Sequence, residues 1–140
     1  MSDTTKLAAM IYGEAANQKP ETMRKVGSTA LNRLAAGKVK EFGGNLDEVL
    51  FKGYYAVKNN SPMYQEAMSG KFKDEVSETA YKQALAIASG LIKGTIKPDK
   101  GEFYFTQKEI NKLKKKGKKA FNFDAVKKLD EFEDYQMFGY

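Results

Sequence analysis

The longest amphipathic segment of the chain, residues 75–93, most constrains how it can fold. Apolar residues recur there every three or four positions, which is the spacing of one face of an α-helix. The residues on this face are Val76, Ala80, Ala84, Ile87, Ala88 and Leu91. Gly94 follows directly, and glycine commonly ends a helix. Because the alanines allow another helix to approach closely, we expect 75–93 to be the central helix of a mostly helical fold.

Helix start and stop signals divide the rest of the chain. Residues 2–4 offer caps for a first helix over 5–16, and Pro20 and Gly37 stand where a second helix would begin and end. The capping-box pattern "TQKE" at 106–109 predicts a helix to about Lys116. The remaining expectations are short helices over 46–51, 62–69 and 124–131, a loop over 52–60, and strands over 102–106 and 135–140. The pattern predicts a mostly α, α+β fold, as one domain over 1–140 with a short β-hairpin or sheet.

The predicted first helix carries a carboxylate at a position where its pattern calls for an apolar residue. Leu7, Met10 and Ile11 lie on one face, and the next position on that face is Glu14. Glu14 either sits at a rim, solvated or paired with Arg33 or a lysine, or is desolvated against apolar neighbours. Burial disfavours the charged form of a carboxyl group. A carboxylic acid that stays protonated can protonate a leaving oxygen, as a glycosidase requires.

The composition narrows the chemistry further, because the chain has no cysteine and no histidine. Disulfides and thiolate metal sites are therefore excluded, as is every catalytic triad that uses imidazole. The remaining groups favour carboxylate chemistry, for which we expect no metal and no cofactor.

Several polar side chains near Glu14 or on predicted apolar elements are candidates for binding a substrate. They are Tyr12, Ser28, Asn32, Tyr54, Tyr55, Tyr104 and Thr106. Ser28 and Asn32 are four residues apart, so they share a helical face. An inward-facing asparagine is either a satisfied core amide or a functional amide that binds an N-acetyl group or positions the acid. Adjacent tyrosines on a loop are typical of sugar clefts and interfaces, and Gly13 allows another segment to approach the first helix closely.

Two segments in the first quarter of the chain carry a family resemblance. "LAAMIYGEA" at 7–15 and "VGSTALNRL" at 26–34 resemble the first two motifs of the SleB-like cell wall hydrolases, a family of spore cortex-lytic enzymes and phage peptidoglycan hydrolases. Weaker similarities follow in order at "LDEVLFKGYYA", at "ALAIASGLIKG" with "GEFYFT", and at "YQMFGY". The resemblance implies a small lysozyme-like fold and cleavage of the β-1,4 bond between N-acetylmuramic acid and N-acetylglucosamine. It makes Glu14 the catalytic acid and Asn32 the asparagine of the second motif.

The chain departs from the family pattern at two places. Where the family has a Q-F-S segment, this chain has Tyr54 or Tyr55 for the glutamine and Ala56 for the serine. Gln136 stands where the family has a histidine near its closing strand. These differences imply a changed substrate subsite.

The number of motif carboxylates favours one reaction route. A hydrolase of this kind needs two carboxyl groups across the glycosidic bond, and only Glu14 lies in a recognisable motif. Asp47, Glu48, Asp99 and Glu102 have the pattern of helix-end or loop charges. We therefore expect a lytic transglycosylase, with a hydrolytic lysozyme-type glycosidase and a non-catalytic phage structural or wall-binding module as alternatives.

The charge of the chain suggests an anionic partner. The net charge is +6, and the segment "KLKKKGKKA" at 112–120 is strongly basic. Such a run suits nucleic acid, anionic lipid or an anionic wall polymer, although a solvated helix face is the plainer interpretation. It has no interleaved aromatic residues, so a nucleic-acid binder ranks last. We expect peptidoglycan glycan strands as partner, with phage virion proteins as further candidates, and neither nucleic acid nor membrane insertion.

The N-terminus has no basic segment followed by an apolar run, so no secretion signal is expected. This fits a phage protein that is synthesised in the host cytoplasm and acts on the cell wall, in lysis or from the virion.

Overall fold

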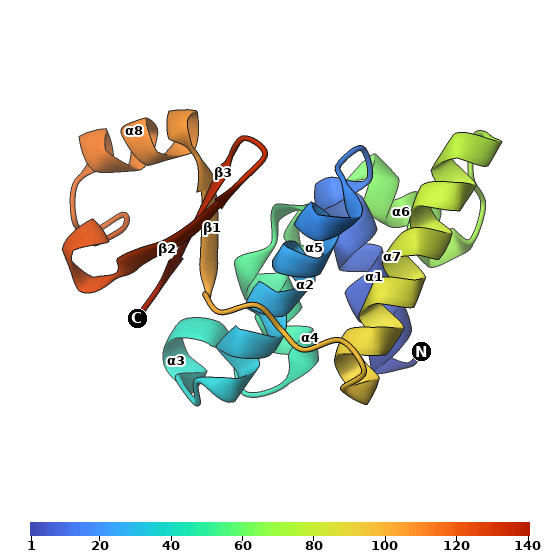
Figure 1. Cartoon of the computed structure of the whole chain (residues 1–140), viewed down its shortest axis with the longest axis horizontal. Coiled ribbons are helices and arrows are strands. Elements are labelled where there is room, and N and C mark those ends of the chain that lie inside the picture. The colour runs from blue at the N-terminus through green and yellow to red at the C-terminus, as the bar shows by residue number, and fades with distance from the viewer. The chain divides into compact units, whose positions relative to one another are not determined.

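The computed structural model describes residues 1–140 and has a mostly helical α+β architecture (Figure 1). Eight α-helices and one short 3-10 helix accompany a three-stranded antiparallel sheet. Contacts divide the chain into two compact units, Met1–Asp99 and Lys100–Tyr140. The predicted fold class, mostly α with a small sheet, is confirmed, whereas a single domain over 1–140 stays a prediction.

The first unit is entirely helical, and the second holds the sheet. The helices of the first unit are α1 (Asp3–Ala15), α2 (Pro20–Ala35), α3 (Val39–Phe42), α4 (Leu46–Gly53), α5 (Tyr55–Lys58), α6 (Pro62–Ser69) and α7 (Glu75–Lys93). The second unit consists of β1 (Phe103–Thr106), α8 (Gln107–Lys116), the 3-10 turn η1 (Phe123–Ala125), β2 (Lys127–Phe132) and β3 (Tyr135–Gly139). None of the helices combines the length and the apolar character needed to cross a bilayer.

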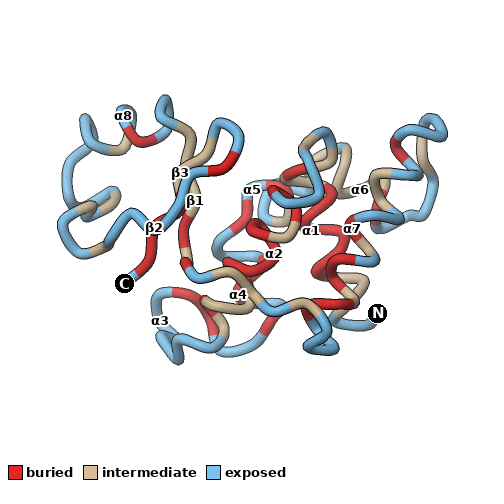
Figure 2. Tube along the Cα trace, viewed as in Figure 1, coloured by how far each residue is buried: buried red, intermediate tan, exposed pale blue.

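Helix α1 is the centre of the first unit. It packs against α2, α4, α5, α6 and α7, and its residues from Leu7 to Tyr12 are fully buried (Figure 2). The expectation that residues 75–93 form the central helix is therefore wrong, although the bounds of that helix are confirmed. The main packing partners of α7 are α1 and α2, so it covers the central helix rather than forming the centre itself.

The buried face of α7 also differs from the predicted one at its first turn. Val76 is 78% exposed, whereas Ser77 is buried. Ala84 and Leu91 are buried as expected, and Ser77 lies seven residues before Ala84. Because seven residues make two helical turns, the face through Ala84 passes through Ser77 and leaves Val76 in solvent.

Most of the helix ends follow the local signals. Ser61 and Asp74 accept hydrogen bonds from backbone N–H groups in the first turns of α6 and α7. Gly70 and Gly94 end these helices with left-handed backbone, φ 72° and 83°. The Thr106–Glu109 capping box of α8 is present with both of its bonds. Residues 62–69 and 75–93 are therefore helical as predicted.

Two local predictions fail, and one short helix is unexpected. Residues 52–60, expected as a loop, contain α5, and α3 is an unexpected single turn that buries Phe42. Residues 124–131, expected as a helix, form η1 and most of β2. Strand β2 pairs with β3 across a turn in which Glu133 has a positive φ of 49°. Pairing with β3 outweighs the weak local preference for helix here.

The sheet of the second unit has the strand order β1-β3-β2. Phe103 lies opposite Phe138, and Tyr104 lies opposite Met137. Alternate residues of β1 point to opposite faces, so its phenylalanines join a cluster of aromatic rings whose members are Phe103, Phe105, Phe121, Phe123 and Phe138. The predicted strands near 102–106 and 135–140 are confirmed.

Candidate active site around Glu14

Glu14 lies in the last turn of α1, where this buried helix reaches the surface of the first unit. Its side chain is half-buried, between fully buried Tyr12 and buried Ala15. Its Oε2 accepts a hydrogen bond of 3.0 Å from the backbone N–H of Ala56. A backbone N–H stabilises the charge of a carboxylate. Glu14 is therefore fixed in position and still reachable from solvent.

Gly13 explains how Ala56 comes so close to Glu14. A Cβ atom built on Gly13 would lie 2.7 Å from Ala56 Cβ and 3.3 Å from Tyr64 Cβ. Helices α5 and α6 can approach α1 at this point only because residue 13 has no side chain. The expectation that Gly13 permits a close approach is confirmed, and this approach carries the Ala56 N–H to the carboxylate.

Tyr54 anchors the segment that carries this donor. Its ring is 1% exposed, and its hydroxyl lies 2.6 Å from Thr29 Oγ1. The Thr29 hydroxyl donates to Val26 O, so the Tyr54 hydroxyl is the donor to Thr29. Burial raises the pKa of Tyr54 above its ordinary value, against the opposing effect of the nearby Arg33. Tyr54 therefore remains a neutral donor at neutral pH.

Arg33 of helix α2 contacts the same segment, at Gly53 and Tyr54. Its guanidinium carbon lies 4.8 Å from the centre of the Tyr54 ring and 5.6 Å from that of Phe42. Its Nη1 donates to Gly53 O over 3.3 Å. Arg33 is only 9% exposed, so it acts as a buried support for the junction between α4 and α5.

The other aromatic candidates of the first unit differ in exposure. Tyr12 is fully buried, donates its hydroxyl to Glu66 Oε1 over 3.3 Å, and packs edge-on against Phe72 and Tyr81. Burial also raises its pKa. Burial leaves Tyr12 and Tyr54 without a face for a sugar, so we place both in the scaffold of the site. Tyr55, 71% exposed, is the candidate that a ligand can reach.

Ser28 and Asn32 share a face of α2, as their spacing predicts, and both bind the backbone of Asp99. Asp99 N donates to Ser28 Oγ over 3.0 Å, and Asn32 Nδ2 donates to Asp99 O over 2.7 Å. The Asp99 carboxylate pairs with Arg24 and Lys25 at 2.9 and 3.6 Å. The Asn32 amide therefore helps to hold the backbone of Asp99. This contact favours a structural role for Asn32 over a role in binding an N-acetyl group.

The candidates of the second unit have local partners. The Thr106 hydroxyl caps α8, accepting from Glu109 N over 3.2 Å. The Tyr104 ring packs edge-on against Tyr135 at 5.6 Å. Both residues are half-buried. Their contacts lie within the second unit and give each of them a structural role there.

Each carboxylate considered as a second catalytic group already has a partner. Asp47 pairs with Lys6 at 2.9 Å, and Asp99 pairs with Arg24 of α2. Glu48 Oε1 accepts a hydrogen bond from Asn45 Nδ2, and Glu102 Oε2 accepts one from Tyr140 N. Glu66 of α6 was not among the candidates, and it accepts bonds from the Tyr12 hydroxyl and from Lys73 N. No group of three or more acidic side chains is arranged to hold a metal ion.

The Ala56 N–H, a hydrogen-bond partner of Glu14, has no signature in the sequence. Every residue except proline carries a backbone donor, so only the tertiary structure identifies this one. Comparison with protein-family models, with curated proteins and with solved structures gave no match to this chain.

Proposed function

We propose that this protein is a peptidoglycan-cleaving muramidase, a lytic transglycosylase of the SleB-like type with a lysozyme-like fold. The observation that carries the proposal is the position of Glu14, half-buried at the end of a buried helix with one oxygen held by Ala56 N–H. The resemblance of residues 7–15 and 26–34 to the family motifs is the reason for proposing the peptidoglycan glycan strand as the substrate. A phage origin, with a role in lysis or in the virion, belongs to the same proposal.

In the proposed reaction Glu14 acts first as an acid and then as a base. It donates its proton to the glycosidic oxygen as the bond from that oxygen to muramyl C1 breaks. The resulting carboxylate takes the proton of the muramyl C6 hydroxyl, and O6 bonds to C1 to close a 1,6-anhydro ring. The Ala56 N–H on Oε2 stabilises the carboxylate between the two steps, and the second transfer returns the proton to Glu14.

The existing partners of the other carboxylates favour this route over hydrolysis. A hydrolase needs a second carboxyl group, at roughly 5 Å when the enzyme retains configuration or roughly 6.5–9.5 Å when it inverts it. Asp99 and Glu66 are held by Arg24 and by the Tyr12 hydroxyl, and the mostly exposed Asp47 pairs with Lys6. A transglycosylase replaces water with a hydroxyl group of the substrate and needs only one carboxyl group.

Mass spectrometry of digested, purified peptidoglycan tests the proposal. Transglycosylation releases muropeptides that end in 1,6-anhydro-N-acetylmuramic acid, lighter by one water than hydrolysis products and resistant to borohydride. Ends that borohydride reduces would show a hydrolytic glycosidase instead. Glu14→Gln should abolish release, while Glu21→Gln, an exposed glutamate in the first turn of α2, should leave it unchanged.

A non-catalytic wall-binding module is the second candidate. It is favoured by the internal partners of Tyr12, Ser28, Asn32 and Tyr54, which leave few of the candidate residues to contact a glycan. Such a module would sediment with purified walls and release no fragments. Zymography with a wall-sedimentation assay on the same preparation separates the two functions.

A further inference from the structure

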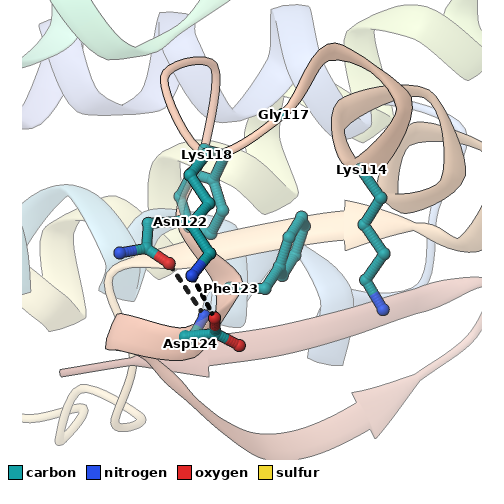
Figure 3. A pocket seen from close by; sticks show the side chains of 7 residues that line it. Lys114, Gly117, Lys118, Asn122, Phe123 and Asp124 are labelled. Atoms are coloured by element: carbon teal, nitrogen blue, oxygen red, sulfur yellow. Dashed lines mark hydrogen bonds and ion pairs between the residues drawn. The ribbon is translucent and has the colours of Figure 1, made fainter.

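The second unit contains a pocket of about 240 Å³ that the proposed reaction does not use (Figure 3). It lies between the C-terminal part of α8 and the segment that follows it. Its lining residues are Lys114, Gly117, Lys118, Phe121, Asn122, Phe123 and Asp124. The aromatic residues follow the lysine run directly in "AFNFD", and the fold brings both kinds of side chain together.

Two ammonium groups flank this pocket. Lys114 Nζ lies 5.4 Å from the centre of the Phe123 ring, and Lys118 Nζ pairs with Asp124 Oδ2 at 2.8 Å. In Figure 3 the side chains of Lys114 and Lys118 extend on opposite sides of Phe123. Lys114 makes no ion pair, so its charge is available to a ligand. Asp124 keeps the flexible Lys118 side chain at the pocket.

Asn122 lines the pocket and is a hydrogen-bond partner of Asp124. Its Oδ1 accepts from Asp124 N over 3.1 Å. Its Nδ2 makes no hydrogen bond within the protein. In Figure 3 the amide nitrogen of Asn122 points away from Lys114, so an anion between Lys114 and Lys118 would meet the two ammonium groups, of which Lys118 already pairs with Asp124. Ammonium groups bind phosphate oxygens through charge-assisted hydrogen bonds.

The half-buried rings on the floor of the pocket are engaged by other aromatic rings and by Lys114. Phe121 and Phe123 pack against each other at 4.7 Å, Phe121 also packs edge-on against Phe103 at 4.9 Å, and Lys114 covers Phe123. Proteins that bind single-stranded nucleic acid without sequence preference rely on exposed rings that stack on bases. Because these rings are packed into the cluster of the second unit, we expect the floor to contact a small apolar group rather than to stack on a series of bases.

We propose that this pocket binds the phosphate group of a polyol-phosphate repeat in an anionic polymer of the cell wall. The proposal rests on the proposed function, which brings the protein to the wall. Ligand pockets for drug-sized molecules are roughly 300–1,000 Å³, so a pocket of about 240 Å³ suits one small repeat. Lys115, Lys116 and Lys119 are exposed in the same segment and lie outside the lining of the pocket.

The test is a titration of the full chain with a glycerol-phosphate oligomer at fixed ionic strength. Lys114→Gln with Lys118→Gln removes the two pocket cations. Lys115→Gln with Lys119→Gln removes the same charge from exposed positions outside the lining. We expect the pocket pair to weaken binding at least roughly tenfold, since each charge-assisted hydrogen bond is worth more than a neutral one. The control pair should weaken it by less than about threefold, because screened exposed charges contribute little.

Two results would overturn the proposal. Equal weakening by both pairs would assign binding to diffuse charge, and tighter binding of a single-stranded oligonucleotide with the same number of phosphates would assign the pocket to nucleic acid. Thermal unfolding of each variant confirms that the fold is kept. Glu14→Gln should bind the oligomer like the wild type. A protein that cleaves glycan but does not bind the oligomer would contradict this proposal alone. A protein that binds the oligomer but does not cleave glycan would contradict the proposed function alone.

Discussion

The backbone N–H of Ala56 donates to Glu14 Oε2 over 3.0 Å, across 42 positions of the sequence. This bond joins the end of α1 to the first turn of α5. Gly13 makes it geometrically accessible, since any Cβ at position 13 would meet Ala56 Cβ. Tyr54, buried two residues before Ala56, holds the other side of the contact. The candidate active site therefore depends on the packing of α1 against α5 as well as on the carboxylate of Glu14.

The first prediction concerns Glu14 itself. Glu14→Gln should keep the fold, because the glutamine oxygen can still accept the Ala56 N–H. Wall-degrading activity should fall by roughly 10²–10⁴-fold, the usual contribution of general acid–base catalysis. Turbidity loss of purified walls measures the activity, and circular dichroism checks the fold. Near wild-type lysis by the variant would refute the assignment.

The second prediction concerns the close approach at Gly13. Gly13→Ala places a methyl group 2.7 Å from Ala56 Cβ and should destabilise the protein by roughly 1–3 kcal/mol, as overpacking does. It should also lower activity by displacing the Ala56 donor. Gly44→Ala is the matched control, because its Cβ would meet Val39 at an ordinary 3.4 Å. Urea denaturation measures both, and equal stability of the two variants would contradict the close contact.

The third prediction concerns the alkaline stability of the fold. Burial raises the pKa of Tyr54 in the folded state, above the value near ~10 of an unfolded tyrosine. The neutral hydroxyl therefore contributes its full stability below pH ~10, and that contribution is lost as the pH rises toward the folded pKa. Denaturation at a series of pH values should show a smaller alkaline loss for Tyr54→Phe than for the wild type. Parallel profiles would mean that Tyr54 does not carry the effect.

The fourth prediction separates a structural from a substrate role for Asn32. Asn32→Ala removes the 2.7 Å bond to Asp99 O and should cost roughly 0.5–1.5 kcal/mol of stability, as for one hydrogen bond. KM on soluble glycan fragments should stay unchanged well below the melting temperature. Tyr55→Ala, at an exposed position, should instead raise KM and leave stability within roughly 0.5 kcal/mol. A raised KM for Asn32→Ala would return this residue to the substrate-binding set.

The fifth prediction concerns salt. If the basic surface contacts an anionic wall, activity on whole walls should fall as salt rises, because exposed charges are screened beyond ~10 Å at 0.1 M. Lys→Glu changes at Lys114, Lys115, Lys116 and Lys118 should weaken wall binding and leave turnover of soluble fragments unchanged. Wall binding that is unaffected by these changes would assign the lysines to solubility alone.

Local signals in the sequence determined much of the helical structure. Thr106 caps the helix that its position predicts, Pro20 begins α2, and Gly94 ends α7. These signals depend on hydrogen bonds and backbone preferences that act within four or five residues. For the same reason the spacing of Ser28 and Asn32 placed them on one face, and the apolar pattern of α1 marked Glu14 as unusual.

The tertiary structure alone decided which of these residues are buried and what they bind. Tyr54 and Tyr55 are neighbours of one residue type, yet one is 1% and the other 71% exposed. Ser28 and Asn32 bind Asp99, and Glu14 receives its donor from Ala56. Strand β2 replaces a predicted helix because it pairs with β3. Burial and pairing are set by groups far away in the chain, and a single sequence carries no local record of those partners.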